Sequence, residues 1–359
     1  MRPLLAQAMA RAVRRKVADT GLDLRGRVVI TECANDAYAV TAAAALAAGA
    51  EVHAFGRSSR YATFAQASDD VRALATALGA DLSGLHLTDD ASTIPWSRVD
   101  LVTNSGHLRP LSADRLELLP DHAVIALMFE AWELRDGDID VATAHRRGLT
   151  IVGVDEHHPA CASFELVGSL AVSESMRQRW SLDGARVLVV SDNAFQAPVL
   201  RALRRAGADA VSCDPRGCVT TAGHVAVGAD AVDHAFDLAV VATTPGKVAA
   251  DGARGPTSPQ RLAALLVQAG VYGVVQLWGD IDRELAEAEG VHFGPAAAPA
   301  PGHQAVPMNG AGFEATVRLQ VGGLAAAAWA LAARQGAQIP ASLAGLLQIV
   351  PNSSAGGRP

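Results

Sequence analysis

The sequence predicts an α/β protein made of two Rossmann-like domains, each a doubly wound parallel sheet. Three observations support this prediction. Short β-branched runs alternate with Ala-rich helical stretches along the chain, which is typical of βαβ units. The alternation occurs in two series, separated by one long helical stretch over residues 162–179. Half of the 359 residues are apolar, which is enough for two buried cores.

The first series begins, after an N-terminal helical segment, with the strand 27–31 (RVVIT), the helix 37–48 and the strand 51–55 (EVHAF). A strand, a helix and a strand of these lengths form one βαβ unit. Two further helices are predicted at 69–78 and 139–147. Four further strands are predicted at 85–87, 100–103, 123–128 and 150–154. Alternation of this kind requires a parallel sheet that is covered on both faces.

The second series begins with the strand 186–190 (RVLVV) and the helix 197–206. Its further strands are predicted at 210–213, 238–242 and 273–277. The stretch 314–334 reads as one long helix that returns to the first domain. The expected domains and tail are residues 1–161 with the return helix 310–340, residues 162–309, and a disordered Ser/Gly/Pro-rich tail at 351–359.

Charge and composition exclude several classes of partner. The formal net charge of −7 gives no basic surface for nucleic acid. No apolar stretch reaches the roughly 18 residues of a membrane span, and the N-terminus lacks the apolar core of a signal peptide. Four cysteines without CxxC spacing favour a reducing compartment. We therefore expect a cytoplasmic protein that binds neither nucleic acid nor membrane.

A series of motifs spans the junction between the two series. An Ile-Asp pair opens a helix, an Arg-Gly turn leads into a strand, and a Glu lies on the bridging helix. The motifs, in chain order, are Ile139-Asp140, Arg147-Gly148, Ile151-Val152, Glu165, Leu182-Asp183-Gly184 and Asp214-Pro215. This order resembles the D-isomer-specific 2-hydroxyacid dehydrogenase family, whose members include formate and glycerate dehydrogenases. The resemblance implies a small carboxylate substrate, NAD or NADP as the cofactor, and a homodimer.

The sequence departs from that family where the chemistry is expected. Glycines let the backbone approach a pyrophosphate at a helix N-terminus, but the segment 191–196 reads SDNAFQ. Asp192 adds a negative charge there. The family's substrate-binding Arg and catalytic His have no clean counterpart, because Trp278-Gly279-Asp280 and Pro307-Met308-Asn309 take their places. Whether a dinucleotide binds at all is therefore left open.

Candidate site residues follow from the rule that ligands bind beyond the carboxyl ends of parallel strands. We expect the loops of both domains to meet in a cleft there. The predicted catalytic residues are His157, His158, Glu130 and His303. The predicted substrate-binding residues are Glu133, Arg135, Asn35, Asn104, Trp278 and Asn309. The predicted cofactor-binding residues are Asp192, Asn193, Asp214, Thr243, Thr244 and Gln276. Glu32 is a further polar residue at such a strand end.

The densest cluster is the loop 155–161 (DEHHPAC). An imidazole titrates near neutral pH, which suits acid–base catalysis, and Asp155 and Glu156 are expected to orient the ring. Adjacent histidines in a loop rarely bind one ion, so no metal site is predicted. The alternative is a solvated hinge loop.

Three other candidates each have a simpler alternative. Arg135 suits bidentate binding of a carboxylate, or forms a surface pair with a Glu. Asp214 suits a ribose diol, or a turn before Pro215. Trp278 lines the cleft, or belongs to the core.

Three functions remain open from the sequence. The first is a small-molecule metabolic enzyme on a dehydrogenase-like scaffold, acting on a small carboxylate or amino-acid-like substrate, with NAD(P)-dependent oxidation as its redox form. The second is a non-redox lyase, hydrolase or isomerase that has lost dinucleotide binding. The third is a non-catalytic ligand-binding subunit.

Overall fold

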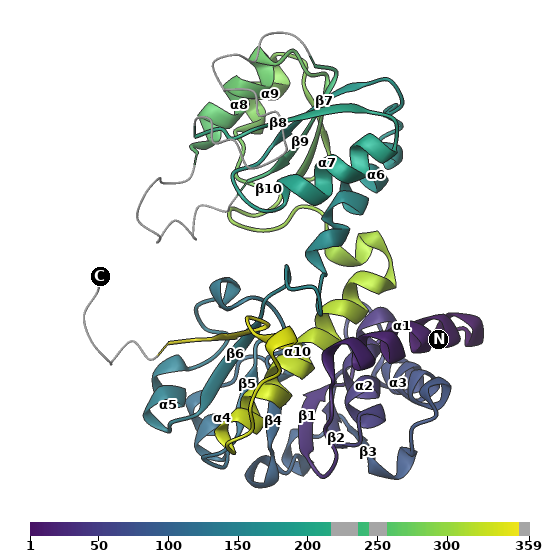
Figure 1. The fold of residues 1–359 in the computed structure, drawn as a ribbon, viewed down its shortest axis with the longest axis vertical. Helices are drawn as coiled ribbons and strands as arrows, with labels where there is room; N and C mark the ends of the chain where they lie inside the picture. The colour runs from purple at the N-terminus through teal and green to yellow at the C-terminus, as the bar shows by residue number, and fades with distance from the viewer. Residues whose placement is uncertain (217–235, 244–256, 352–359) are drawn as a thin grey trace. The chain divides into compact units, whose positions relative to one another are not determined.

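The computed structural model describes residues 1–216, 236–243 and 257–351, and Figure 1 shows their fold. Contacts divide the chain into two compact units. Unit 1 comprises Met1–Ser163 and Phe313–Pro359, and unit 2 comprises Phe164–Gly312. Each unit is built on its own sheet. The predicted fold class, two Rossmann-like parallel-sheet domains, is confirmed.

Unit 1 contains a seven-stranded sheet in the order β12-β6-β5-β4-β1-β2-β3. Neighbouring strands are parallel except β12, which pairs antiparallel with β6. Counted from β3, the parallel strands follow the doubly wound order 3-2-1-4-5-6. The strands are β1 (Val28–Glu32), β2 (Glu51–Phe55), β3 (Leu85–Thr88), β4 (Leu101–Thr103), β5 (Val124–Ala126), β6 (Thr150–Val154) and β12 (Leu347–Ile349).

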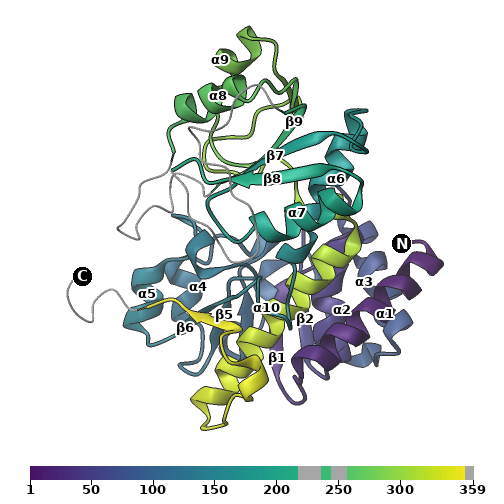
Figure 2. The ribbon, with the colours of Figure 1, turned by 45° about the horizontal axis from the view of Figure 1, so that its top comes forward.

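Helices cover both faces of this sheet (Figure 2). One apolar cluster joins α1 (Pro3–Thr20), α2 (Val40–Ala47), α3 (Phe64–Leu78) and α10 (Phe313–Arg334) to one face. A second cluster joins α4 (Ala113–Glu117) and α5 (Val141–Arg146) to the other. Among the described helices, α10 alone is long and apolar enough to cross a membrane, but 72% of its most apolar window is buried inside the protein. Such burial is expected for a helix in the core of a domain.

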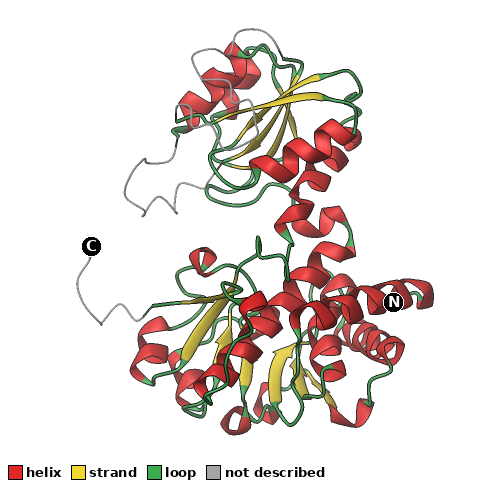
Figure 3. Cartoon of the chain, viewed as in Figure 1, coloured by secondary structure: helices red, strands yellow, loops and turns green. Residues whose placement is uncertain are grey.

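Unit 2 contains a five-stranded parallel sheet in the order β11-β10-β9-β7-β8. Its helices also lie on both faces (Figure 3): α6 and α7 pack on one side, and α8 and α9 on the other. The elements are α6 (Val167–Arg177), β7 (Arg186–Val190), α7 (Gln196–Arg205), β8 (Asp209–Cys213), β9 (Leu238–Ala242), α8 (Pro259–Gln268), β10 (Gly273–Trp278), α9 (Arg283–Ala288) and β11 (His292–Gly294).

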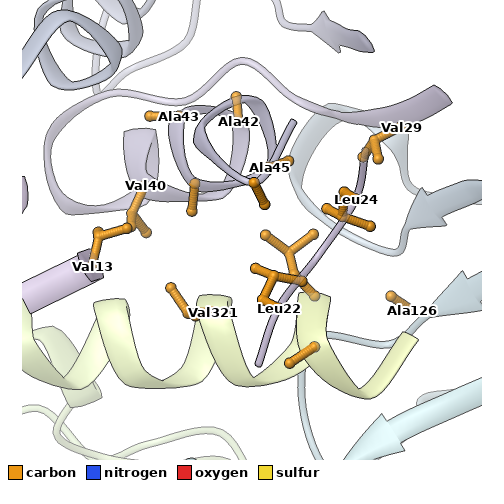
Figure 4. Packing of buried hydrophobic residues seen from close by; sticks show 14 of the residues in the cluster. Val13, Leu22, Leu24, Val29, Val40, Ala42, Ala43, Ala45, Ala126 and Val321 are labelled. Carbon is orange, nitrogen blue, oxygen red and sulfur yellow. The ribbon is translucent and has the colours of Figure 1, made fainter. Parts of the chain in front are cut away.

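Small side chains allow the helices of unit 1 to pack closely. The buried residues Ala42–Ala45 of α2 face the same core as Val13 of α1 and Val321 of α10 (Figure 4). On α10, a Cβ at Gly322 would lie 2.8 Å from Cys161 Sγ. The consecutive glycines of α10 therefore let this helix lie directly against the loops that follow β5 and β6.

The observed elements differ from the predicted ones mainly at their ends. The long helix predicted at 162–179 begins only at Val167, because Ala162 has a φ of 53° and a short 3-10 turn follows it. The helix α3 begins five residues earlier than predicted, since Thr63 and Gln66 form a capping box. The short strands β11 and β12 were not predicted. Most of the predicted tail lies outside the described residues.

One close contact in unit 2 makes the packing testable. A Cβ at Gly168 of α6 would lie 2.2 Å from Pro198 O and 2.6 Å from the Cβ of Ala202 on α7. We expect Gly168→Ala to lower the free energy of unfolding by about 1–3 kcal/mol, because the two helices must separate. Urea denaturation followed by circular dichroism measures this. Ser173→Ala on the exposed face of α6 is the control and should be nearly neutral. Wild-type stability of Gly168→Ala would contradict the contact.

Candidate functional site

The strand order of unit 1 brings two loops together at one edge of the sheet. β1 pairs with β4 on one side and β2 on the other, so the strand order reverses between β1 and β4. Ligands of open α/β sheets bind at such a switch point, beyond the carboxyl ends of the strands. Glu32 ends β1, and the segment 104–109 follows β4. These residues form the candidate site.

Glu32 is a carboxyl group adapted to exchange a proton near neutral pH. Burial raises its pKa to about 7, although the Arg109 charge and a hydrogen bond with Ser105 act in the opposite direction. Ser105 continues a buried chain of hydroxyls through Thr103 at 2.7 Å and Thr31 at 2.9 Å. A general acid or base works best when its pKa lies near the operating pH.

The backbone at Gly106 makes room for this carboxyl group. Gly106 has a φ of 46°, and a Cβ there would lie 1.8 Å from Glu32 Oε2. A larger residue would be both strained and in collision with the carboxylate. Glycine is therefore required at this position.

Arg109 supplies a cation beside Glu32. Its Nε and Nη2 donate to the backbone oxygen of Asn104 at 2.9 and 2.7 Å, and its guanidinium lies 5.4 Å from the ring centroid of Phe129. Asp138 is its nearest carboxylate, at 3.9 Å. Burial lowers the pKa of Arg109, although Asp138 and Glu32 raise it. This half-buried guanidinium can bind an anionic ligand.

Asn104, a predicted substrate-binding residue, is fully buried at this site, with 0% of its surface exposed. Its Nδ2 lies 3.5 Å from Asp138 Oδ2. Within the described ranges, Asn104 Oδ1 has no hydrogen-bond partner. Leaving a buried acceptor unsatisfied costs about 1–3 kcal/mol, so Asn104 Oδ1 would gain from a donor, which reaches this unexposed atom only if the residues around it move.

Tyr38 connects this site to a second group of acidic residues. It lies on a short 3-10 helix, Asp36–Ala39, and burial raises the pKa of its phenol; the charges of Glu32, Arg109 and Glu156 also act on it. The second group comprises Glu130, Glu133 and Glu156, in the loops after β5 and β6. Both groups therefore belong to one polar region of unit 1.

Buried carboxyls dominate the second group. Glu156 is 2% exposed and accepts a hydrogen bond from Ser163 Oγ. Burial raises its pKa well above the usual value, and Glu133 raises it further. The pKa of Glu133 is raised to about 7 by burial and then by Glu130. Burial also raises the pKa of Glu130, whose carboxylate accepts from the Glu156 amide at 3.0 Å and from Trp132 Nε1. Protons are therefore held here near neutral pH.

The acidic residues of the histidine loop contact neighbouring groups. Asp155 Oδ1 accepts from the backbone amide of His157 at 2.9 Å, and Glu156 is buried against Ser163. His158 Nδ1 accepts from the Ala160 amide at 3.1 Å, which fixes that ring in a turn. His157 is exposed, and its charge acts on Glu130. A catalytic role for either histidine stays a prediction.

Two other predicted residues of unit 1 are placed as follows. Arg135 is exposed, whereas Arg109 is half-buried. Asn35 lines a surface hollow of about 320 Å³ together with Tyr61, Gln66 and Asp70. The residues that sequence reasoning missed are Arg109 and Tyr38. Arg109 lies five residues after Asn104, on the loop that follows β4, and this position could have indicated it. The sequence does not show that this loop lies beside Glu32, because that depends on the strand order.

In unit 2, side chains of the loop after β7 form hydrogen bonds with backbone groups of that loop and of β9. Asn193 Oδ1 accepts from the Phe195 amide at 3.0 Å, and Asn193 Nδ2 donates to Ala242 O at 3.2 Å. Ser191 Oγ also donates to Ala242 O, at 3.0 Å. An amide at the start of α7, which a pyrophosphate would need, is thus engaged by the Asn193 side chain.

The charge of Asp192 is balanced, which the sequence did not indicate. Its side chain is 1% exposed and lies 3.7 Å from Arg216 Nε. Asp214, the predicted ribose-binding residue, accepts from the same guanidinium at 3.2 Å and from the Arg216 amide at 2.9 Å. The expected repulsion of phosphates by Asp192 is therefore reduced by Arg216.

Two predictions in unit 2 need correction. Trp278 is buried in the core, stacked on Phe195 with ring centroids 4.8 Å apart, so it does not line a substrate site. Gln276 is also buried: its Oε1 accepts from Arg283, and its Nε2 donates to Gly279 O at 2.6 Å. Both side chains are engaged structurally, which leaves no polar group for a cofactor.

The remaining predicted residues are placed as follows. Thr243 is buried at the end of β9, His303 is exposed with its Nδ1 3.0 Å from Pro301 O, and Asn309 is exposed on the short 3-10 helix Met308–Ala311. Thr244 lies outside the described residues. Their predicted roles are untested by this geometry.

No family model matches the sequence, and a search of curated proteins returns no match. Solved structures do match. One dipicolinate synthase chain, from Bacillus halodurans, is 12% identical, with 83% of this chain and 96% of that chain covered and a TM-score of 0.55. Its counterpart from Bacillus subtilis is 13% identical, with 88% and 99% covered and a TM-score of 0.57. A 2-hydroxyacid dehydrogenase from Ketogulonicigenium vulgare Y25 is 13% identical, with 91% and 99% covered and a TM-score of 0.45.

These matches concern the fold. The two dipicolinate synthase chains share it over most of their length and most of this chain. The fold of two Rossmann-like domains expected from the sequence is thus shared with these two solved structures.

The raised pKa of Glu32 predicts how stability depends on pH. The folded state keeps the proton until about pH 7, whereas an ordinary Glu loses it near 4.5. The stabilising contribution is complete below about pH 4.5 and is lost as the pH rises to about 7. Glu32→Gln cannot ionise, so its free energy of unfolding should fall less steeply across this window.

Urea denaturation at several pH values between about 4.5 and 8 measures this slope. Glu133 contributes in the same window, so the slope should be reduced and not abolished. Glu289→Gln, an exposed carboxyl in unit 2, should keep the wild-type slope. An unchanged slope in Glu32→Gln would show that Glu32 is ionised at neutral pH.

Proposed function

We propose that the protein is an enzyme on a dehydrogenase-like scaffold, whose unit 1 binds a small carboxylic acid carrying a hydroxyl or amino group and moves a proton on it. One observation supports this most strongly. At the switch point, Glu32 has a pKa of about 7 beside the Arg109 guanidinium and the unpartnered Asn104 Oδ1. An acid–base group, a cation and an acceptor are thus gathered at the edge where such sheets bind ligands.

Each of the three residues has a distinct role in the proposal. Arg109 binds the substrate carboxylate, which a guanidinium can do with two parallel hydrogen bonds. Asn104 Oδ1 accepts from the hydroxyl or amino group next to it, and this fixes the orientation of the substrate. Glu32 then gives or takes the proton, since at neutral pH both of its protonation states are populated.

The comparison supports a carboxylate substrate indirectly. Dipicolinate synthase, named for both structures with the higher TM-scores, is named after a dicarboxylate. We take from this name only the chemical class of the ligand. The Arg109 cation is a group of the candidate site that suits that class.

The geometry of unit 2 does not favour the usual mode of dinucleotide binding. The loop after β7 has no glycine, and its Asn193 side chain engages the Phe195 amide at 3.0 Å. No step of the proposed reaction is therefore routed through NAD or NADP. The proton transfer by itself corresponds to an isomerase or a lyase, which is the non-redox alternative left open by the sequence.

Substituting Arg109 and Arg135 in turn tests which of the two binds the substrate carboxylate. Malate carries a carboxylate and a neighbouring hydroxyl, and succinate lacks the hydroxyl. We expect malate to bind more tightly than succinate. We expect Arg109→Gln to weaken malate binding at least about tenfold, because the variant loses a charged hydrogen bond to the carboxylate. Arg135→Gln, which changes an exposed guanidinium, should change it little. Isothermal titration calorimetry of the full chain in metal-free buffer measures both.

The same experiment can contradict the proposal in two ways. A large loss in Arg135→Gln with none in Arg109→Gln would restore the role predicted for Arg135 from the sequence. Failure of wild-type protein to bind malate or succinate would reject this substrate class.

Titration with NAD⁺ and NADP⁺ tests the redox alternative. We expect weak binding or none, because Asn193 and Phe195 occupy the place of a glycine-rich turn. Arg216→Gln should weaken any residual binding further, since it leaves the charge of Asp192 unbalanced. A dissociation constant in the micromolar range or below, measured by calorimetry, would overturn this expectation and restore the dehydrogenase function.

A further inference from the structure

Three side chains able to bind a metal ion lie together on β2 and β3, the last two strands at one side of the unit 1 sheet. Glu51 and His53 belong to β2, and His86 belongs to β3. One possible ligand atom from each lies within 4.8 Å of the other two. The spacing in the sequence does not reveal this group, because His86 lies 33 residues after His53.

The strand geometry makes this arrangement a consequence of the fold. Residues two apart on a strand point to the same face, so Glu51 and His53 share a face. In the parallel pairing of β2 with β3, His53 lies opposite His86. The two imidazole rings stack with centroids 4.5 Å apart and an angle of 19° between their planes.

The distances are close to those of a metal site. His53 Nε2 lies 2.8 Å from Glu51 Oε1, and His86 Nε2 lies 4.0 Å from the same oxygen. Ligands at about 2.0–2.1 Å from a tetrahedral Zn²⁺ ion are roughly 3.4 Å apart. The His86 ring, whose side chain is 50% exposed, would have to turn out of its stack with His53 to reach that spacing.

The surroundings favour an open site over a closed one. Arg98 Nη2 donates to both oxygens of Glu51, at 3.2 and 3.0 Å, and so fixes the orientation of the carboxylate, as outer partners of metal ligands do. Glu51 and His86 also border a surface hollow of about 640 Å³, which is further lined by Asp81 and Ser83. Solvent or a small ligand could occupy the remaining coordination positions from this side.

This cluster is separate from the proposed substrate site. Glu51 pairs with Val28 at the start of β1, whereas Glu32 ends that strand. Four residues of strand separate the two positions, about 13 Å. The two sites therefore lie toward opposite ends of the strands.

We propose that Glu51, His53 and His86 bind one divalent transition-metal ion of the Zn²⁺ type. Two imidazoles and a carboxylate are a ligand set found for zinc, with a fourth position left open. The ligands must bind in their deprotonated forms, so binding weakens as the pH falls. The proposal does not depend on the reaction proposed for unit 1.

The test is calorimetric titration of the metal-stripped full chain with ZnCl₂. We expect one ion per chain, and at least about a tenfold loss of affinity in His86→Gln, since losing a direct ligand should exceed the 10–100-fold effect of an outer partner. His122→Gln is the matched control: His122 is 51% exposed and lies 3.3 Å from the carboxylate of Asp100. It should bind Zn²⁺ like the wild type.

Co²⁺ provides an independent readout. The visible absorption of bound Co²⁺ should be lost in His86→Gln and retained in His122→Gln, and circular dichroism shows whether both variants are folded. Equal Zn²⁺ affinity in wild type and His86→Gln, or equal losses in both variants, would overturn the proposal. The three residues would then serve only to join β2 to β3, through the stacked rings of His53 and His86.

Discussion

The pairing of β1 with β4 is the constraint on which the candidate site depends. Val29 and Ile30 lie opposite Leu101 and Val102, and the hydroxyls of Thr31 and Thr103 are 2.9 Å apart at the end of this pair. The pairing places Glu32 beside the loop after β4, although some 70 residues separate them in the chain. Gly106 then allows the loop to lie against the carboxylate. Without this neighbour, Glu32 would be an ordinary carboxyl at a strand end.

Desolvation is the main electrostatic effect in unit 1. It raises the pKa of Glu32, Glu130, Glu133 and Glu156, and in each case it outweighs the hydrogen bonds that act in the opposite direction. Carboxyls buried in this way reduce stability when they ionise. Such groups are frequent at functional sites, where stability is given up for reactivity. Unit 2 differs, because Asp192 and Asp214 share one cation there, Arg216, at 3.7 and 3.2 Å.

Close packing of helices on the unit 1 sheet supports this arrangement. The alanines of α2 and the glycines of α10 let both helices lie against the sheet, and α10 contacts the loop that carries Glu156 through Cys161. A rigid sheet with helices packed on it holds the loops at its edge in place.

The sequence by itself determined the secondary structure and the fold class, because hydrophobic periodicity is a local property. The strands β2, β6, β7 and β9 were predicted with their observed bounds, and the absence of glycine at 191–196 was also visible. It also indicated Glu32, Asn104 and Glu130 as polar residues at strand ends. Only the tertiary structure decided which strand ends are neighbours, and hence that Arg109 lies beside Glu32 and His86 beside His53. It also placed Trp278 in the core and Glu156 in a buried pocket of carboxyls. Strand order and burial arise from contacts between distant segments, which a local pattern does not contain.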